Sequence, residues 1–80
     1  AYPNPFNNHT TVKYGLPETG LVNLTIFDLS GRKMMELVND EQSAGNHELD
    51  VNCTELTSGI YILSLKANRM NFTQKLVLVK

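Results

Sequence analysis

The sequence contains no tryptophan, a single cysteine and three prolines among its 80 residues, and its charges nearly cancel. One cysteine allows neither an internal disulfide nor a thiolate metal cluster, so Cys53 is expected to be a buried structural thiol. Seven basic and eight acidic side chains leave no basic stripe that would favour nucleic acid or an anionic lipid surface. No apolar run approaches the roughly 18 residues that cross a bilayer, and the N-terminus lacks the pattern of a signal peptide.

Residues that carry chemistry are equally sparse. The only histidines are His9 and His47, and strand parity places His47 on an inward face, which favours a histidine bonded to backbone at the edge of the core. Residues 39–41 lack the alternating Asp and Asn positions of a calcium loop, and the glycines form no phosphate-binding pattern. A chain of this length buries only about 60% of the surface that its unfolded form exposes, which leaves little volume for a deep pocket. The sequence therefore predicts no catalytic residue, no metal site and no cofactor.

What the sequence does have is an alternation of apolar and polar residues with a period of two, interrupted by turn residues roughly every 8 to 14 positions. No long segment shows the 3.6-residue period of a helix. Six or seven short strands cannot bury their apolar faces as one open sheet. The sequence therefore predicts one all-β domain, a small immunoglobulin-like antiparallel β-sandwich of six to seven strands. The expected strands cover residues 11–16, 21–29, 33–38, 47–52, 60–67 and 72–80.

Glycines and an aspartate mark the predicted tight turns. Asp28 is expected to cap its own backbone in an Asx-turn, and Gly31 to take the left-handed conformation that such a turn needs. Positive φ is also expected at Gly20, and Gly59 is expected to adopt a backbone conformation that a side chain would forbid.

Three segments between the clear strands have their own predictions. Residues 33–38 fit no clean period, which favours an edge strand with a bulge. Residues 39–46 are polar with a glycine near the end, which indicates an exposed loop. Residues 53–58 are compatible either with a single helical turn or with a crossover between sheets.

The last strand is apolar on both faces. Alternation requires only one apolar face, yet residues 76–79 are all apolar, so one face is expected to be covered by something besides the core. The cover is either a partner or a second copy of the domain, or the chain's own segment Tyr2–Phe6. Lys75 and Lys80 discourage uncontrolled edge pairing while the backbone can still pair with a chosen partner. The residues expected to be recognised are Lys75, Leu76, Val77, Leu78, Val79 and Lys80.

Several stretches together resemble a known family, the C-terminal sorting domain of the type IX (Por) secretion system of Bacteroidetes and related bacteria. The resemblance runs in order over essentially the whole chain, from the opening Tyr-Pro-Asn-Pro-Phe to the closing strand with its terminal lysine. The chain departs from the family's usual pattern at Val51, where many members carry an aromatic residue, and at Cys53. The positions that carry the resemblance, besides the closing strand, are Tyr2, Pro3, Asn4, Pro5, Phe6, Asp28, Gly31, Arg32, Gly45, Gly59 and Tyr61.

The resemblance implies that residues 1–80 are one non-catalytic sorting module, with a proline-stiffened lead-in at residues 1–9. Such a module directs a cargo protein fused to its N-terminus across the outer membrane, for attachment to the surface or for release. The implied partners are an outer-membrane translocon and a sortase-like peptidase, which commonly removes the domain by a cut N-terminal to Tyr2. The implied location is the periplasm, in transit to the cell surface or the extracellular space.

The residues alone also allow an interpretation from a different class, an accessory immunoglobulin-like module of a secreted glycoside hydrolase that binds polysaccharide or spaces domains. Sandwiches that bind sugars usually stack exposed aromatic rings against the sugar. Tyr14 and Tyr61 point inward by parity, which leaves Phe27 and Phe72 among the scattered candidates. The two interpretations differ in one respect: a sorting domain is the last domain of its gene product, whereas a sugar-binding module can lie anywhere.

Overall fold

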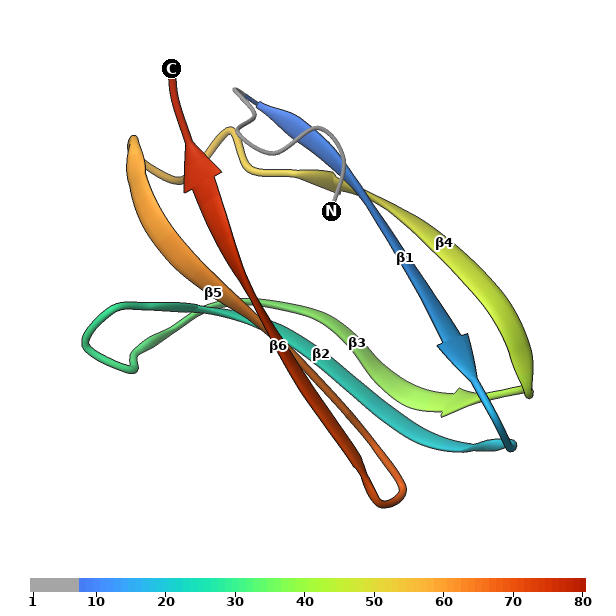
Figure 1. Cartoon of the computed structure of the whole chain (residues 1–80). Helices are drawn as coiled ribbons and strands as arrows, with labels where there is room; N and C mark the ends of the chain where they lie inside the picture. The colour runs from blue at the N-terminus through green and yellow to red at the C-terminus, as the bar shows by residue number, and fades with distance from the viewer. Residues whose placement is uncertain (1–7) are drawn as a thin grey trace.

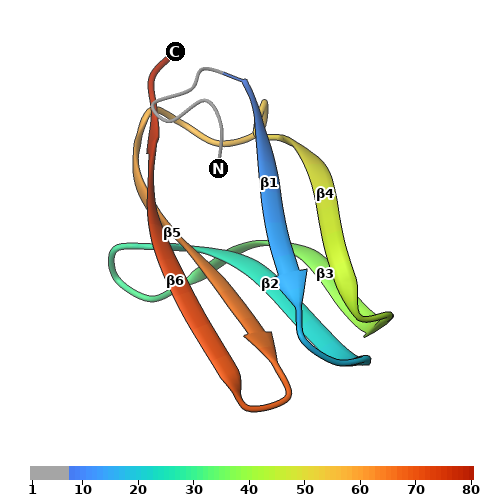
Figure 2. The ribbon, with the colours of Figure 1, turned by 45° about the vertical axis from the view of Figure 1, so that its right-hand side comes forward.

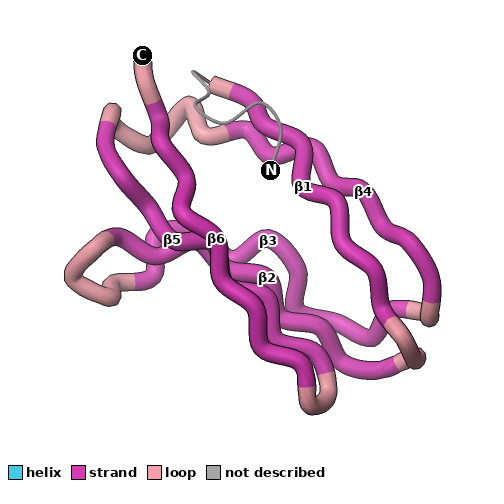
Figure 3. The backbone as a smooth tube through the Cα atoms, viewed as in Figure 1, coloured by secondary structure: helices cyan, strands magenta, loops and turns pink. Residues whose placement is uncertain are grey.

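The chain forms six antiparallel strands and no helix over residues 8–80, the range that this computed structural model describes (Figure 3). Alternating β-branched and aromatic residues favour extended backbone in most of these segments. No helix in this range could span a membrane. The strands are β1 (His9–Leu16), β2 (Gly20–Asp28), β3 (Lys33–Gln42), β4 (Gly45–Asn52), β5 (Gly59–Ala67) and β6 (Met70–Leu78).

The strands build two sheets that pack face to face (Figures 1 and 2). β1 and β4 pair with each other as a two-stranded sheet, and the other sheet has the order β3-β2-β5-β6. Every pairing is antiparallel. The predicted all-β sandwich is therefore confirmed, and among the strands of residues 8–80 β3 and β6 lie at the two edges of the larger sheet.

The core lies between the two sheets, where alternate residues of the strands point inward. On β2 the predicted inward residues Val22, Leu24 and Ile26 are each only 1% exposed. Val51 and Cys53, the two departures from the family pattern, are also buried, and burial raises the pKa of the Cys53 thiol against the opposing charge of Lys80. The buried apolar residues are Val12, Leu16, Val22, Leu24, Ile26, Val51, Cys53, Leu56, Tyr61, Leu63, Leu65, Ala67, Leu76 and Leu78.

The prediction of an exposed loop at residues 39–46 was wrong for most of its length. β3 continues to Gln42, and its polar second half pairs with β2, for example Asn39 with Asn23. Polar side chains are compatible with this pairing because β3 is an edge strand. The predicted bulge is confirmed, since the β2–β3 register shifts at Leu24/Thr25 and at Ile26/Phe27.

Residues 53–58 form the crossover from β4 in one sheet to β5 in the other, one of the two predicted alternatives. The Cys53 backbone N–H donates to the Asn8 carbonyl over 2.7 Å, which fixes the crossover to the start of β1. β1 itself begins at His9, within the range expected for the lead-in. The predicted cover by Tyr2–Phe6, and the motif residues in that segment, lie outside the described residues.

Candidate functional site

The C-terminal strand β6 divides its apolar residues between two faces of the sheet. Leu76 pairs with Tyr61 and Leu78 with Gly59, and both leucines are core residues with 0% and 1% exposure. Val77 pairs with Ile60, so it points to the opposite, outer face, and beyond the strand Val79 is 55% exposed. Of the two apolar pairs in residues 76–79, the leucines therefore serve the core, and the valines belong to the outer side.

The lysines of the last strand occupy different surroundings. Lys75 pairs with Ile62 on the outer face of the sheet. Lys80 lies over the crossover, where its backbone N–H donates to the Ser58 hydroxyl over 3.0 Å and its Nζ donates to the Thr54 carbonyl over 2.6 Å. The structure thus brings the predicted recognition residues to one strand and its tail, and it presents Lys75, Val77, Val79 and Lys80 on the surface side.

The β2–β3 turn is organised by the carboxylate of Asp28. Its Oδ1 accepts hydrogen bonds from the Ser30 and Arg32 backbone N–H groups, each over 2.9 Å, and from the Ser30 hydroxyl over 2.8 Å. Its Oδ2 accepts from Arg32 Nε over 2.9 Å. These bonds, led by the Arg32 backbone N–H, lower the pKa of Asp28 from 3.8 to about 2. The predicted Asx-turn is confirmed, and Gly31 has the expected positive φ of 89°.

Two glycine predictions need correction. Gly20 does not have positive φ. An added Cβ there would lie 2.2 Å from the Asn68 side-chain oxygen in the β5–β6 turn, so a larger residue at position 20 would clash with Asn68. Gly59 does not have positive φ either, and an added Cβ would lie 3.9 Å from the Tyr61 ring. The conformation reserved for glycine is instead found at Gly45, with φ of 121° at the start of β4.

Tyr61 and His47 each form a side-chain hydrogen bond to the backbone of a neighbouring loop. The Tyr61 hydroxyl donates to the Thr57 carbonyl over 2.7 Å, so it ties the crossover to β5. His47 stacks on Tyr14 with ring centroids 5.3 Å apart, and its Nε2 lies 2.7 Å from the Ser43 carbonyl oxygen. The predicted histidine at the core edge, bonded to backbone, is confirmed. In residues 8–80 no three His, Cys, Asp or Glu side chains gather in a way that could hold a metal ion.

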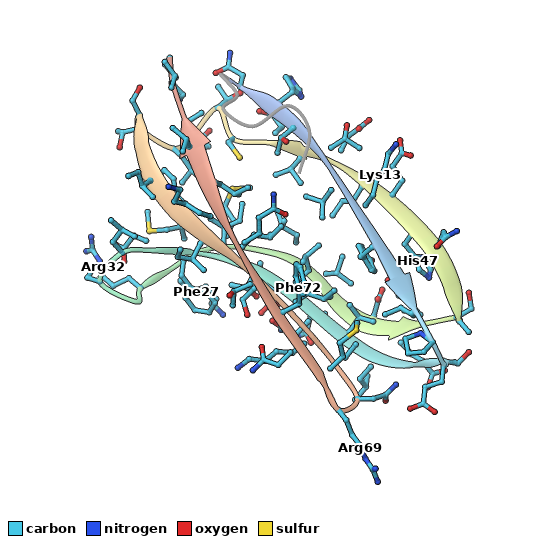
Figure 4. All side chains as sticks on the ribbon, viewed as in Figure 1. Lys13, Phe27, Arg32, His47, Arg69 and Phe72 are labelled. Atoms are coloured by element: carbon cyan, nitrogen blue, oxygen red, sulfur yellow. The ribbon has the colours of Figure 1, made fainter. Side chains whose placement is uncertain are left out.

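A cleft of about 260 Å³ opens between β1 and β6. Phe72 lines it from the inner face of β6, opposite Leu65, and is nevertheless 61% exposed. Phe27, by contrast, lies on the outer face of the same sheet (Figure 4). The two phenylalanines are therefore on opposite faces and cannot form one platform for a sugar ring. The main apolar residues of the cleft are Val12, Tyr14, Leu63, Leu65, Met70 and Phe72.

Sequence reasoning missed the apolar part of the outer face of the four-stranded sheet. Phe27, Ile60 and Ile62 share this face, and Ile60 is 42% exposed. The available signal was parity, because Ile60 and Ile62 alternate with the inward-facing Tyr61 and Leu63. Their meeting with Phe27 depends on the register between β2 and β5, which a single sequence does not give.

Comparison with known proteins identifies the family of this chain. A search of the curated proteins finds no match to the chain. The family model for the secretion system C-terminal sorting domain matches residues 1–80, the same range over which the opening motif, the Asp28 turn and the closing strand follow one another. The chain therefore belongs to the C-terminal sorting domains of type IX secretion, which are signals for passage through the cell envelope toward the surface or the exterior.

Proposed function

We propose that the secretion machinery recognises this domain through β6 and its tail, Lys75–Lys80. The observation that carries the proposal is that β6 is the last described strand of the larger sheet, and that Val77 on β6 and Val79 in the tail after it lie outside the core. A partner can contact the side chains that this segment presents outside the core, and pockets on the partner that fit those side chains give selectivity. The two lysines supply charge at either end of this segment.

The domain acts in this proposal by being bound, and it performs no catalysis itself. The bound partner is an outer-membrane translocon that receives the domain from the periplasm. A sortase-like peptidase then cuts N-terminal to Tyr2 and separates the domain from the cargo on its N-terminal side. The family assignment supports these steps because a sorting signal has to meet the machinery that sorts it.

The test is an export assay with a periplasmic reporter fused to residues 1–80 in a host that has the secretion system. Lys75→Glu with Lys80→Glu, and deletion of residues 79–80, should each lower the exported fraction of the reporter. Deletion from Val77 onward is unsuitable because it also removes Leu78, a core residue that is 1% exposed.

The matched control is Lys13→Glu with Lys66→Glu, which makes the same change in net charge on exposed side chains elsewhere. Thermal melts followed by circular dichroism establish that each variant is folded. If the folded double variant and the folded deletion are both exported as well as the parent and the control, the C-terminal strand is not the recognised element.

A further inference from the structure

The two outer faces of the sandwich differ in composition. On the β1–β4 sheet the outward positions are all polar or glycine: His9 with Asn52, Thr11 with Asp50, Lys13 with Glu48 and Gly15 with Asn46. A sandwich sheet that faces only water is expected to show this pattern. The outer face of the four-stranded sheet departs from it at Phe27, Ile60, Ile62 and Val77, and separately at Leu21 near the other end of β2.

These four side chains occupy neighbouring positions on adjacent strands and form what we call the outer patch. Phe27 pairs with Ile62 across β2 and β5, and Ile60 pairs with Val77 across β5 and β6. On the next row the face becomes polar, with the small buried residues Thr25 and Ser64 paired. The patch therefore ends at the row formed by Thr25 and Ser64. Leu29, in the turn that follows β2, is also exposed, at 67%.

Basic side chains stand at both lateral margins of the outer patch. Lys33 on β3 pairs with Phe27, and Lys75 on β6 pairs with Ile62, so one row across the sheet is basic, apolar, apolar, basic. Three strand spacings separate the two lysine backbones by about 14 Å. Arg32 lies at the tip of the β2–β3 turn beside the patch (Figure 4).

The carboxylates near Lys33 and Arg32 hold these two cations only weakly. Lys33 Nζ lies 3.5 Å from Glu36, with 59% of the Lys33 side chain exposed, and Arg32, which bonds Asp28, is 78% exposed. Exposed ion pairs of this kind contribute little to stability, so their cations can exchange to carboxylates of a partner at little cost. A second copy stacked face to face on this patch would instead set like charges against each other.

We propose that the outer patch is a docking surface for a protein of the secretion machinery whose contact surface has an apolar centre and carboxylates at its margin. The proposal rests on the sorting function and extends the contact surface beyond β6: the patch shares Val77 and the marginal Lys75 with β6, and its other residues lie on β2, β3 and β5. The apolar centre of such a contact supplies most of the affinity, and the marginal charges supply orientation and association rate.

The test uses substitutions outside β6, so that it is separate from the test of the C-terminal strand. In the reporter fusion, Ile60→Asp should lower the exported fraction roughly tenfold, as expected for a residue at the centre of an interface. Lys33→Glu should lower it by a smaller factor, because it stands at the margin. Both variants should melt cooperatively, since Ile60 and Lys33 are exposed.

The chain offers a matched control for each substitution. Leu21 is an exposed apolar residue of the same sheet, 71% exposed and outside the patch, so Leu21→Asp should leave export unchanged. Lys13, like Lys33, is an exposed strand lysine beside a glutamate, with Nζ 4.0 Å from Glu48. Lys13→Glu should therefore also leave export unchanged.

A photo-crosslinking amino acid at position 60 identifies what lies on the patch during export, with position 11 on the polar outer face as the control. The expected product joins position 60 to a protein of the secretion machinery, and Lys33→Glu weakens it whereas Lys13→Glu does not. Folded Ile60→Asp and Lys33→Glu variants that are exported like their controls would overturn the proposal, even if the β6 variants fail in export. If Ile60→Asp and Lys33→Glu lower export while the β6 variants do not, the result would support the outer patch and count against β6 as the recognised element.

Two further measurements can overturn the choice of occupant. Sedimentation with phosphatidylglycerol vesicles that exceeds sedimentation with phosphatidylcholine vesicles, and is lost in Lys33→Glu, would assign the patch to an anionic membrane. A dimer in sedimentation velocity that Ile60→Asp dissociates would assign it to a second copy of the chain. The proposal expects neither.

Discussion

At the scale of single residues, Asp28 does more than terminate β2. One carboxylate accepts hydrogen bonds from two backbone N–H groups, a hydroxyl and a guanidinium. The bonds from the two backbone N–H groups hold the backbone of the turn and so place residue 32 at its tip, beside the outer patch. Asp28 and Arg32 are both among the positions that carry the resemblance to the family, and their bond gives a physical reason for the presence of the two residues in this chain.

The low pKa of Asp28 predicts how this residue affects stability at different pH values. Because its pKa falls from 3.8 to about 2 on folding, the ionised carboxylate stabilises the fold above pH 3.8, and this contribution is lost as the pH falls toward 2. Asp28→Asn does not titrate and should unfold at lower urea concentration than the parent above pH 3.8. The difference between the two midpoints should shrink as the pH approaches 2, and a difference independent of pH would contradict this assignment.

At the scale of elements, the sequence predicted which way most residues face but not which residues meet. The period of two placed Leu24 inward and Phe27 outward, because alternation within a strand is a local property. The pairing of Phe27 with Ile62 depends on register between strands, and the extension of β3 through Asp40 to Gln42 depends on the pairing that β2 offers. The local pattern of apolar and polar residues determines neither the register between strands nor the length of β3.

The two faces of β2 give a direct test of the predicted alternation. Leu24→Asp places an unpaired charge at a site that is 1% exposed, which costs a large part of the roughly 5–15 kcal/mol that stabilises a small domain. The variant should therefore show no cooperative melt, and Leu63→Asp on β5, 5% exposed, should behave likewise. Leu21→Asp, at a site that is 71% exposed, should melt within about 0.5 kcal/mol of the parent. A cooperative melt near the parental temperature for both core variants would mean that the assigned faces are reversed.

At the scale of the whole molecule, the residues of the core and the residues of the two proposed recognition surfaces lie on different faces of the strands. The inner faces of both sheets hold the apolar residues that make the domain stable, and one outer face is polar throughout its paired positions. The remaining outer face and the edge strand β6 carry the apolar and basic residues that burial in the core does not explain. A sorting domain needs such surfaces because its role is to be recognised.

The central claim is that this domain is sufficient as a signal for export through the type IX pathway. The most direct measurement is the exported fraction of a periplasmic reporter that carries residues 1–80 at its C-terminus, compared with the same reporter without them, in a host with an intact secretion system and in one whose translocon is deleted. The reporter should be exported only when both the domain and the translocon are present. Retention of the domain-bearing reporter in the periplasm of the intact host, with the domain folded, would contradict the central claim.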